Sequence, residues 1–177
     1  MPARASALAE FYGGPVWKAH RETANETMID SDNVLLLRPL VPSHGPVVIS
    51  RPAKETIPGF PTSLIVVTVY SFRNSSADFQ RFFESTLRPE LVRHGVVVLA
   101  TMTTETAANN FPRLPVREGE TAFVWMATFD SAETWRAIST QLSSSPAWQR
   151  AQQQLQPQLK SPAQQLRLQP TRRSTLR

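Results

Sequence analysis

The side chains near the start of the chain that are best suited to chemistry are His20, Arg21 and Asn25. On a helix beginning at Pro15, His20 and Arg21 share one face with Trp17, and Asn25 flanks them. An imidazole can exchange a proton near neutral pH, and a guanidinium can hold an anion. His20, Arg21 and Asn25 are therefore the candidate catalytic residues, and Trp17 is a candidate ligand or interface contact.

The same residues also fit a structural cluster at an interface between modules. In that interpretation Arg21 pairs with a carboxylate such as Glu26 or Asp30, since buried polar groups are usually partnered. The three histidines are scattered, and the sequence has no His-x-x-x-His pair and no Gly-rich phosphate loop. We therefore expect no metal and no cofactor. The sequence favours a protein without catalytic activity but leaves an enzyme open.

A second candidate region is the long connection over residues 104–118, between two predicted strands. Long loops on rigid sheets often bind ligands or partners, although this one equally fits an arm that packs on a neighbouring subunit. Its side chains suited to ligand or interface contact are Asn110, Phe111, Arg113 and Arg117. Trp125, in the following strand, either belongs to the core or faces a ligand cavity. Both faces of that strand are apolar, which predicts cover on two sides.

Composition and charge limit the classes of function. The chain of 177 residues has no cysteine, which excludes disulfides and thiolate chemistry, and its longest apolar runs are too short for a transmembrane segment. The net charge of +5 arises in residues 131–177, where seven basic groups face a single acid, Glu133. A solvated basic terminus explains this better than nucleic-acid binding, because no aromatic residues are interleaved for base stacking. We expect no nucleic-acid partner.

The elements from residue 64 onward follow a regular order. Four apolar segments predict strands: "LIVVTVYSF" at 64–72, "VVVLATMTT" at 96–104, "TAFVWMATF" at 121–129 and "QQLRLQP" at 164–170. Helical spacing fills the two longer gaps. Pro89 should interrupt the first helix, and a capping box of Asp130 and Glu133 should open the second. The order β-α-β-β-α-β is the split arrangement of α+β, ferredoxin-like modules.

The front of the chain repeats its end. A helix starting at Pro15 and a predicted strand "NVLLLRP" at 33–39 match the last helix and strand at one offset of 131 positions. The matched pairs are Pro15 with Pro146, Trp17 with Trp148, Leu35 with Leu166, Leu37 with Leu168, and Pro39 with Pro170. Such self-similarity indicates a duplicated unit. We expect the closing part of a first module at 1–40, a Pro-rich linker at 41–63, a complete module at 64–172 and a basic tail at 173–177.

Three segments together resemble the NIPSNAP family: "FYGGPVWKAHRETANETMIDSDNVLLLRP", "NNFPRLPVREGE" and "LRLQPTRRS". The resemblance covers most of residues 8–174 apart from the linker. It implies ferredoxin-like modules that assemble as a dimeric α+β barrel, here preceded by a partial copy of helix and strand. It also implies a homo-oligomer, a dimer or dimer-based, with room for a small apolar ligand between sheets.

The resemblance implies little about activity. We expect a non-catalytic assembly or binding protein. The alternative is a small metal-free enzyme of the same barrel type, like a monooxygenase or isomerase, using His20 and Arg21. The expected location is the cytoplasm of a bacterium, or the mitochondrion if the chain is eukaryotic. Whether Met1 is the native start stays open.

Overall fold

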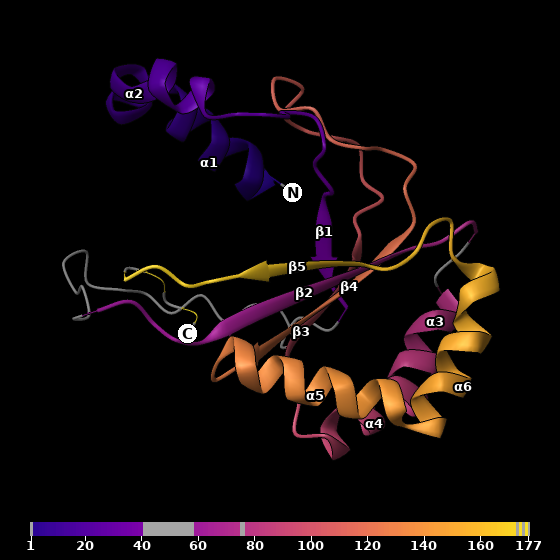
Figure 1. Ribbon diagram of the computed structural model, residues 1–177. Coiled ribbons are helices and arrows are strands. Elements are labelled where there is room, and N and C mark those ends of the chain that lie inside the picture. Colours follow the sequence, from indigo (N-terminus) through magenta and orange to yellow (C-terminus); the bar gives the residue numbers. More distant parts are fainter. Residues whose placement is uncertain (1, 41–58, 75–76, 173, 175, 177) are drawn as a thin grey trace. The chain divides into compact units, whose positions relative to one another are not determined.

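The computed structural model describes residues 2–40, 59–74, 77–172, 174 and 176 (Figure 1). The predicted linker over 41–63 and the basic tail over 173–177 lie largely outside the described residues. The chain forms two compact units. The smaller combines Met1–Leu37 with Thr104–Glu120, and the larger combines Arg38–Thr103 with Thr121–Arg177.

The larger unit is built on a five-stranded sheet with the order β1-β3-β4-β2-β5. Its strands are β1 (Leu37–Pro39), β2 (Leu64–Ser71), β3 (Val97–Thr104), β4 (Ala122–Phe129) and β5 (Gln164–Leu168). β2 pairs antiparallel with both β4 and β5, and β3 pairs antiparallel with β4. From β2 to β5 the elements follow the predicted β-α-β-β-α-β order, so the α+β, ferredoxin-like fold is confirmed.

β1 is shorter than the strand predicted over residues 33–39, of which only Leu37–Pro39 belongs to the sheet. The prediction is wrong for the residues before it, because a polar loop supplies their hydrogen-bond donors. The backbone N–H of Arg117 donates to the carbonyl of Val34 at 2.8 Å. The backbone N–H of Glu105 donates to the carbonyl of Leu36 at 2.8 Å.

The helices of the larger unit cover one face of the sheet (Figure 1). They are α3 (Ala77–Phe82), α4 (Arg88–Arg93), α5 (Ala132–Ser144) and α6 (Pro146–Leu155). Alternate residues of β2, among them Val66 and Tyr70, belong to the same buried cluster as Phe83, Leu87 and Leu155 from the helical layer. Since side chains alternate along a strand, the remaining residues of β2 face the other way.

The helical segment after β2 is interrupted, as Pro89 predicts. Between α3 and α4 lies a π turn, η2 (Phe83–Leu87), in which the N–H of Arg88 donates to the carbonyl of Phe83, five residues earlier. Proline has no N–H to donate, and a wider turn directly before it accommodates this loss. After α4 the chain turns at Gly95, whose φ of +80° lies in the left-handed region that favours glycine.

The N-cap of α5 lies one residue later than predicted. Ser131 is the N-cap, and its side-chain oxygen accepts from the backbone N–H of Thr134 at 3.2 Å. The predicted cap at Asp130 is therefore wrong. Ser131 replaces it because its hydroxyl is the group within reach of the first free N–H groups of the helix.

Ser145 joins α5 and α6 to α4. Its hydroxyl accepts from the N–H of Trp148 at 3.3 Å, which caps α6, and donates to Oε1 of Glu90 at 2.5 Å. Glu90 is only 5% exposed, with Arg93 2.8 Å from its Oε2 and His94 3.3 Å from its Oε1. These interactions, led by the hydrogen bond from Ser145, lower the pKa of Glu90.

We predict that Glu90→Gln lowers the free energy of unfolding at pH 7 by about 1–3 kcal/mol, because it removes charge-assisted hydrogen bonds. A lowered folded-state pKa stabilises the fold above the unfolded pKa of about 4.3, and that contribution is lost as the pH falls through the folded pKa. Urea unfolding at pH 7 and pH 3 should therefore show a deficit that disappears in acid. Glu84→Gln, which breaks an exposed pair with Arg88, is the control. A deficit independent of pH would contradict this role for Glu90.

One buried hydroxyl of β2 lacks a partner. Thr68 lies among the core residues with 2% exposure, and its Oγ1 has no hydrogen-bond partner among the described residues. Leaving a buried hydroxyl unpaired costs about 1–3 kcal/mol. Valine has nearly the same shape and no such group.

Thr68→Val should therefore raise the free energy of unfolding by about 1 kcal/mol. The measurement is chemical denaturation at pH 7, with Thr128→Val as the control because Thr128 is only half-buried. That control should change stability by less than about 0.5 kcal/mol. A clear loss in Thr68→Val would mean that the hydroxyl is paired in solution.

Candidate functional site

The smaller unit starts with two helices that meet at a glycine. They are α1 (Pro2–Gly13) and α2 (Pro15–Glu26). The N–H of Gly14 donates to the carbonyl of Phe11 at 3.1 Å. A Cβ on Gly14 would lie 3.0 Å from the carbonyl oxygen of Glu10 and 3.3 Å from that of Phe11. A side chain at this position would force these backbone carbonyls to shift by a few tenths of an ångström, so the close turn favours glycine.

Tyr12 is the centre of an aromatic cluster. Its ring meets Trp17 edge-on, with 4.9 Å between centroids and 84° between planes, and it meets Phe11 similarly at 5.1 Å and 82°. On its other side it stacks on Phe111 at 5.7 Å and 17°. Both arrangements are favourable for aromatic rings. Tyr12 thus connects the two helices with the loop that follows β3.

Asn109 holds that loop in shape. Its side-chain oxygen accepts from the N–H of Phe111 at 3.1 Å, and its amide donates to the carbonyl of Leu114 at 2.9 Å. Arg4 of α1 donates to the side-chain oxygens of Asn109, at 3.0 Å, and Asn110, at 2.8 Å. The loop that the sequence predicted as a binding region or a packing arm is therefore attached to the N-terminal helices of its own chain.

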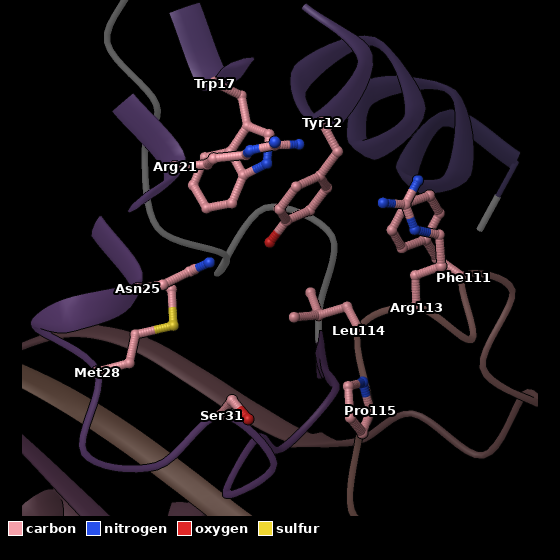
Figure 2. A pocket seen from close by; sticks show the side chains of 10 residues that line it. All are labelled: Tyr12, Trp17, Arg21, Asn25, Met28, Ser31, Phe111, Arg113, Leu114 and Pro115. Carbon is pink, nitrogen blue, oxygen red and sulfur yellow. The ribbon is translucent and has the colours of Figure 1, made fainter. Parts of the chain in front are cut away.

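A pocket of about 320 Å³ lies between these helices and the loop (Figure 2). It is lined by Tyr12, Trp17, Arg21, Asn25, Met28, Ser31, Phe111, Arg113, Leu114 and Pro115. Five of these were singled out from the sequence: Trp17, Arg21, Asn25, Phe111 and Arg113. Residues about four positions apart form one row along a helix, which is why α2 presents its three together.

Three other candidates lie elsewhere. His20 is exposed on α2 and does not line the pocket, since it lies off the row of Trp17, Arg21 and Asn25. Asn110 accepts the hydrogen bond from Arg4. Arg117 uses its backbone N–H to bind the carbonyl of Val34.

Trp125 belongs to the larger unit. It is 4% exposed, and its ring centroid lies 6.1 Å from that of Phe83 in the helical layer. Its neighbours Phe123 and Val124, on opposite faces of β4, are 1% and 2% exposed. Trp125 therefore lies in the core of the larger unit, and β4 is buried on both faces around it.

The pocket carries positive charge that is not neutralised locally. Among the described residues, neither Arg21 nor Arg113 forms an ion pair, and no carboxylate lines the pocket. The predicted pairing of Arg21 with Glu26 or Asp30 is not formed. Asp30 instead accepts from the backbone N–H groups of Asp32 and Asn33, at 3.1 and 3.3 Å.

Five lining residues were not among the candidate site residues chosen from the sequence: Tyr12, Met28, Ser31, Leu114 and Pro115. Tyr12 could have been predicted as a site residue, because the pair "FY" stands directly before the two glycines at which one helix ends and the next begins. Ser31 and the loop residues gave no such signal, since their position depends on the fold of the loop.

The described residues contain no group of three or more histidine, aspartate or glutamate side chains placed to hold a metal ion. None of the described helices is long and apolar enough to cross a membrane.

Gly14→Ala should disturb the contact between Tyr12 and Trp17, because the new methyl group meets backbone carbonyls rather than a movable side chain. We expect a loss of about 1–3 kcal/mol in stability and a shift of the Trp17 indole N–H signal in NMR spectra. Gly13→Ala is the matched control, since no atom lies within 4 Å of its added Cβ. Equal effects of the two variants would contradict the close turn.

Comparisons with known proteins support the fold. No family model matches the sequence, and none of the curated proteins matches it. A NIPSNAP family protein of unknown function from Agrobacterium tumefaciens shares 14% identity and a TM-score of 0.53, over 66% of this chain and 96% of that chain. An uncharacterized NIPSNAP-like domain protein from Burkholderia xenovorans shares 17% identity and a TM-score of 0.50, over 64% and 90%.

A cofactor-independent oxygenase from Streptomyces nogalater shares 13% identity and a TM-score of 0.43, over 65% of this chain and 97% of that chain. A likeness at that score does not bear on activity. The two NIPSNAP structures carry no assigned chemistry, and identities this low speak for the fold alone. The resemblance predicted from the sequence is thus supported by structure, and this chain has the α+β fold of NIPSNAP family proteins.

Proposed function

We propose that this chain is a non-catalytic, NIPSNAP-like assembly protein that associates with a second copy through the sheet face turned away from its helices. The observation that carries the proposal is the exposure of large apolar side chains on that face. Leu166 and Leu168 of β5 are 51% and 47% exposed, and Val97 of β3 is 57% exposed. Leu166 and Leu168 are neighbours on one face of β5, and contiguous exposed apolar surface usually marks a site that another protein covers.

The strand register supports this surface. Leu168 pairs with Ile65 and Leu166 with Val67, so both leucines lie on the face opposite to Val66 and the helical layer. On β4, Met126 pairs with Val67 and continues the same row. An apolar sheet face needs a second layer, and an identical face on another copy is self-complementary under two-fold symmetry. This is the dimer-based arrangement that the family resemblance implies.

We also propose that residues 1–40 are the closing helix and strand of a partial module, before the complete module at 64–172. α2 and α6 both begin at a proline, with Trp17 and Trp148 two residues further on. The strands that follow them, β1 and β5, form the two edges of the sheet. α6 buries Ala151 and Leu155, whereas α2 buries no residue.

The pocket supports binding rather than turnover. Its described lining contains guanidinium, amide and hydroxyl groups, but no imidazole or carboxylate to move a proton. The enzyme alternative would need His20, which lies outside the lining. A cytoplasmic location stays a proposal, supported by the lack of cysteine.

The test is the mass of the particle in solution, measured by light scattering after size-exclusion chromatography. We expect a dimer or a multiple of it for the unaltered chain, and a monomer for the double variant Leu166→Asp with Leu168→Asp, because charges would be buried in the contact. Gln165→Asp, on the opposite face of the same strand, should keep the dimer. Circular dichroism checks that each variant is folded. A monomeric mass of the unaltered chain at about 100 μM, a concentration far above the Kd of stable interfaces, would overturn the proposal.

A further inference from the structure

We infer that the pocket of the smaller unit binds a small aromatic carboxylate. The pocket combines two guanidinium groups, a wall of aromatic rings and a volume of about 320 Å³. That volume is at the lower end for small-molecule sites, which are commonly about 300–1,000 Å³. The inference is independent of self-association, because the sheet face proposed for that contact belongs to the larger unit.

The charge in the pocket selects an anion. Arg21 comes from α2 beside Trp17, and Arg113 comes from the loop beside Phe111, so the two guanidinium groups stand on different walls (Figure 2). Neither is neutralised by a carboxylate of the described residues. A guanidinium binds a carboxylate through two parallel hydrogen bonds, and this geometry is stronger than a neutral contact.

The rings and apolar side chains select an aromatic body. Tyr12, Trp17 and Phe111 hold one another in fixed edge-on and stacked geometry, so this wall is formed before a ligand arrives. Met28 and Leu114 add apolar surface on other sides. A bare phosphate or sulfate would use the arginines but leave these groups uncovered, which makes an aromatic anion the better match.

Two further polar groups give orientation. In Figure 2 the hydroxyl of Tyr12 and the amide nitrogen of Asn25 both point toward the open centre of the pocket. Both can donate to an oxygen of the ligand. The site therefore offers a ring-lined wall for the body of the ligand and several donors for its carboxylate.

The experiment is isothermal titration of the full chain with three probes: 2-naphthoate, its neutral amide naphthalene-2-carboxamide, and inorganic phosphate. We expect saturable binding of 2-naphthoate, with the amide and phosphate each at least about tenfold weaker, since the amide loses the charge-assisted hydrogen bonds and phosphate loses the contact with the rings. Binding should shift the Trp17 indole N–H signal, which places the probe in this pocket.

Arg21→Gln and Arg113→Gln should each weaken 2-naphthoate about tenfold. Lys18→Gln, on the same helix, should stay within about twofold because Lys18 is exposed and does not line the pocket. All three positions are exposed, and unfolding curves confirm that the variants remain folded. The inference is overturned by no binding of 2-naphthoate below about 5 mM, a concentration that corresponds to only about 3 kcal/mol. Equal binding of amide or phosphate, or an unchanged affinity in both arginine variants, overturns it as well.

Discussion

The alternation of side chains along β2 is the constraint on which the larger unit depends. β2 lies between β4 and β5 and pairs with both, so its register fixes which face each of the three strands presents. Val66 and Tyr70 meet the helical layer, and Val67 meets the opposite side. The helices α3 to α6 cover the face of Val66 and Tyr70. The apolar side chains on the other face, above all Leu166 and Leu168, are what a second copy would cover.

Local patterns were enough to predict most of the larger unit. The β-branched runs of β2 and β4, the break at Pro89 and the turn at Gly95 are properties of neighbouring residues, and the structure confirms them. The errors arose where a competing donor or acceptor decides the outcome. Ser131 replaces Asp130 as a cap, and the loop takes the hydrogen bonds that would have extended β1 toward Leu35.

The pocket could be predicted only in part. The helical spacing of Trp17, Arg21 and Asn25 placed them together, because their neighbourhood is local. Their partners on the loop depend on contacts such as Arg4 with Asn109, which are 105 positions apart in the sequence. No local pattern encodes such a contact. His20 was expected in the site for the same reason. The sequence does not show which side of α2 the loop approaches, and the loop lies on the side of Trp17, Arg21 and Asn25.

α2 of the smaller unit and α6 of the larger unit are similar in sequence but differ in burial. Both helices begin at a proline and carry a tryptophan two residues later, yet α6 buries its inner side chains and α2 buries none. Where α6 meets its own sheet, α2 meets a ring-lined pocket with two guanidinium groups. The central claim, a second copy on the sheet face opposite α3 to α6, is tested most directly by dipolar spectroscopy on a single spin label. The chain has no cysteine, so Gln164→Cys on that face gives one labelled position per copy. The account predicts a single defined distance between labels of two copies, and the absence of any intermolecular coupling would contradict it.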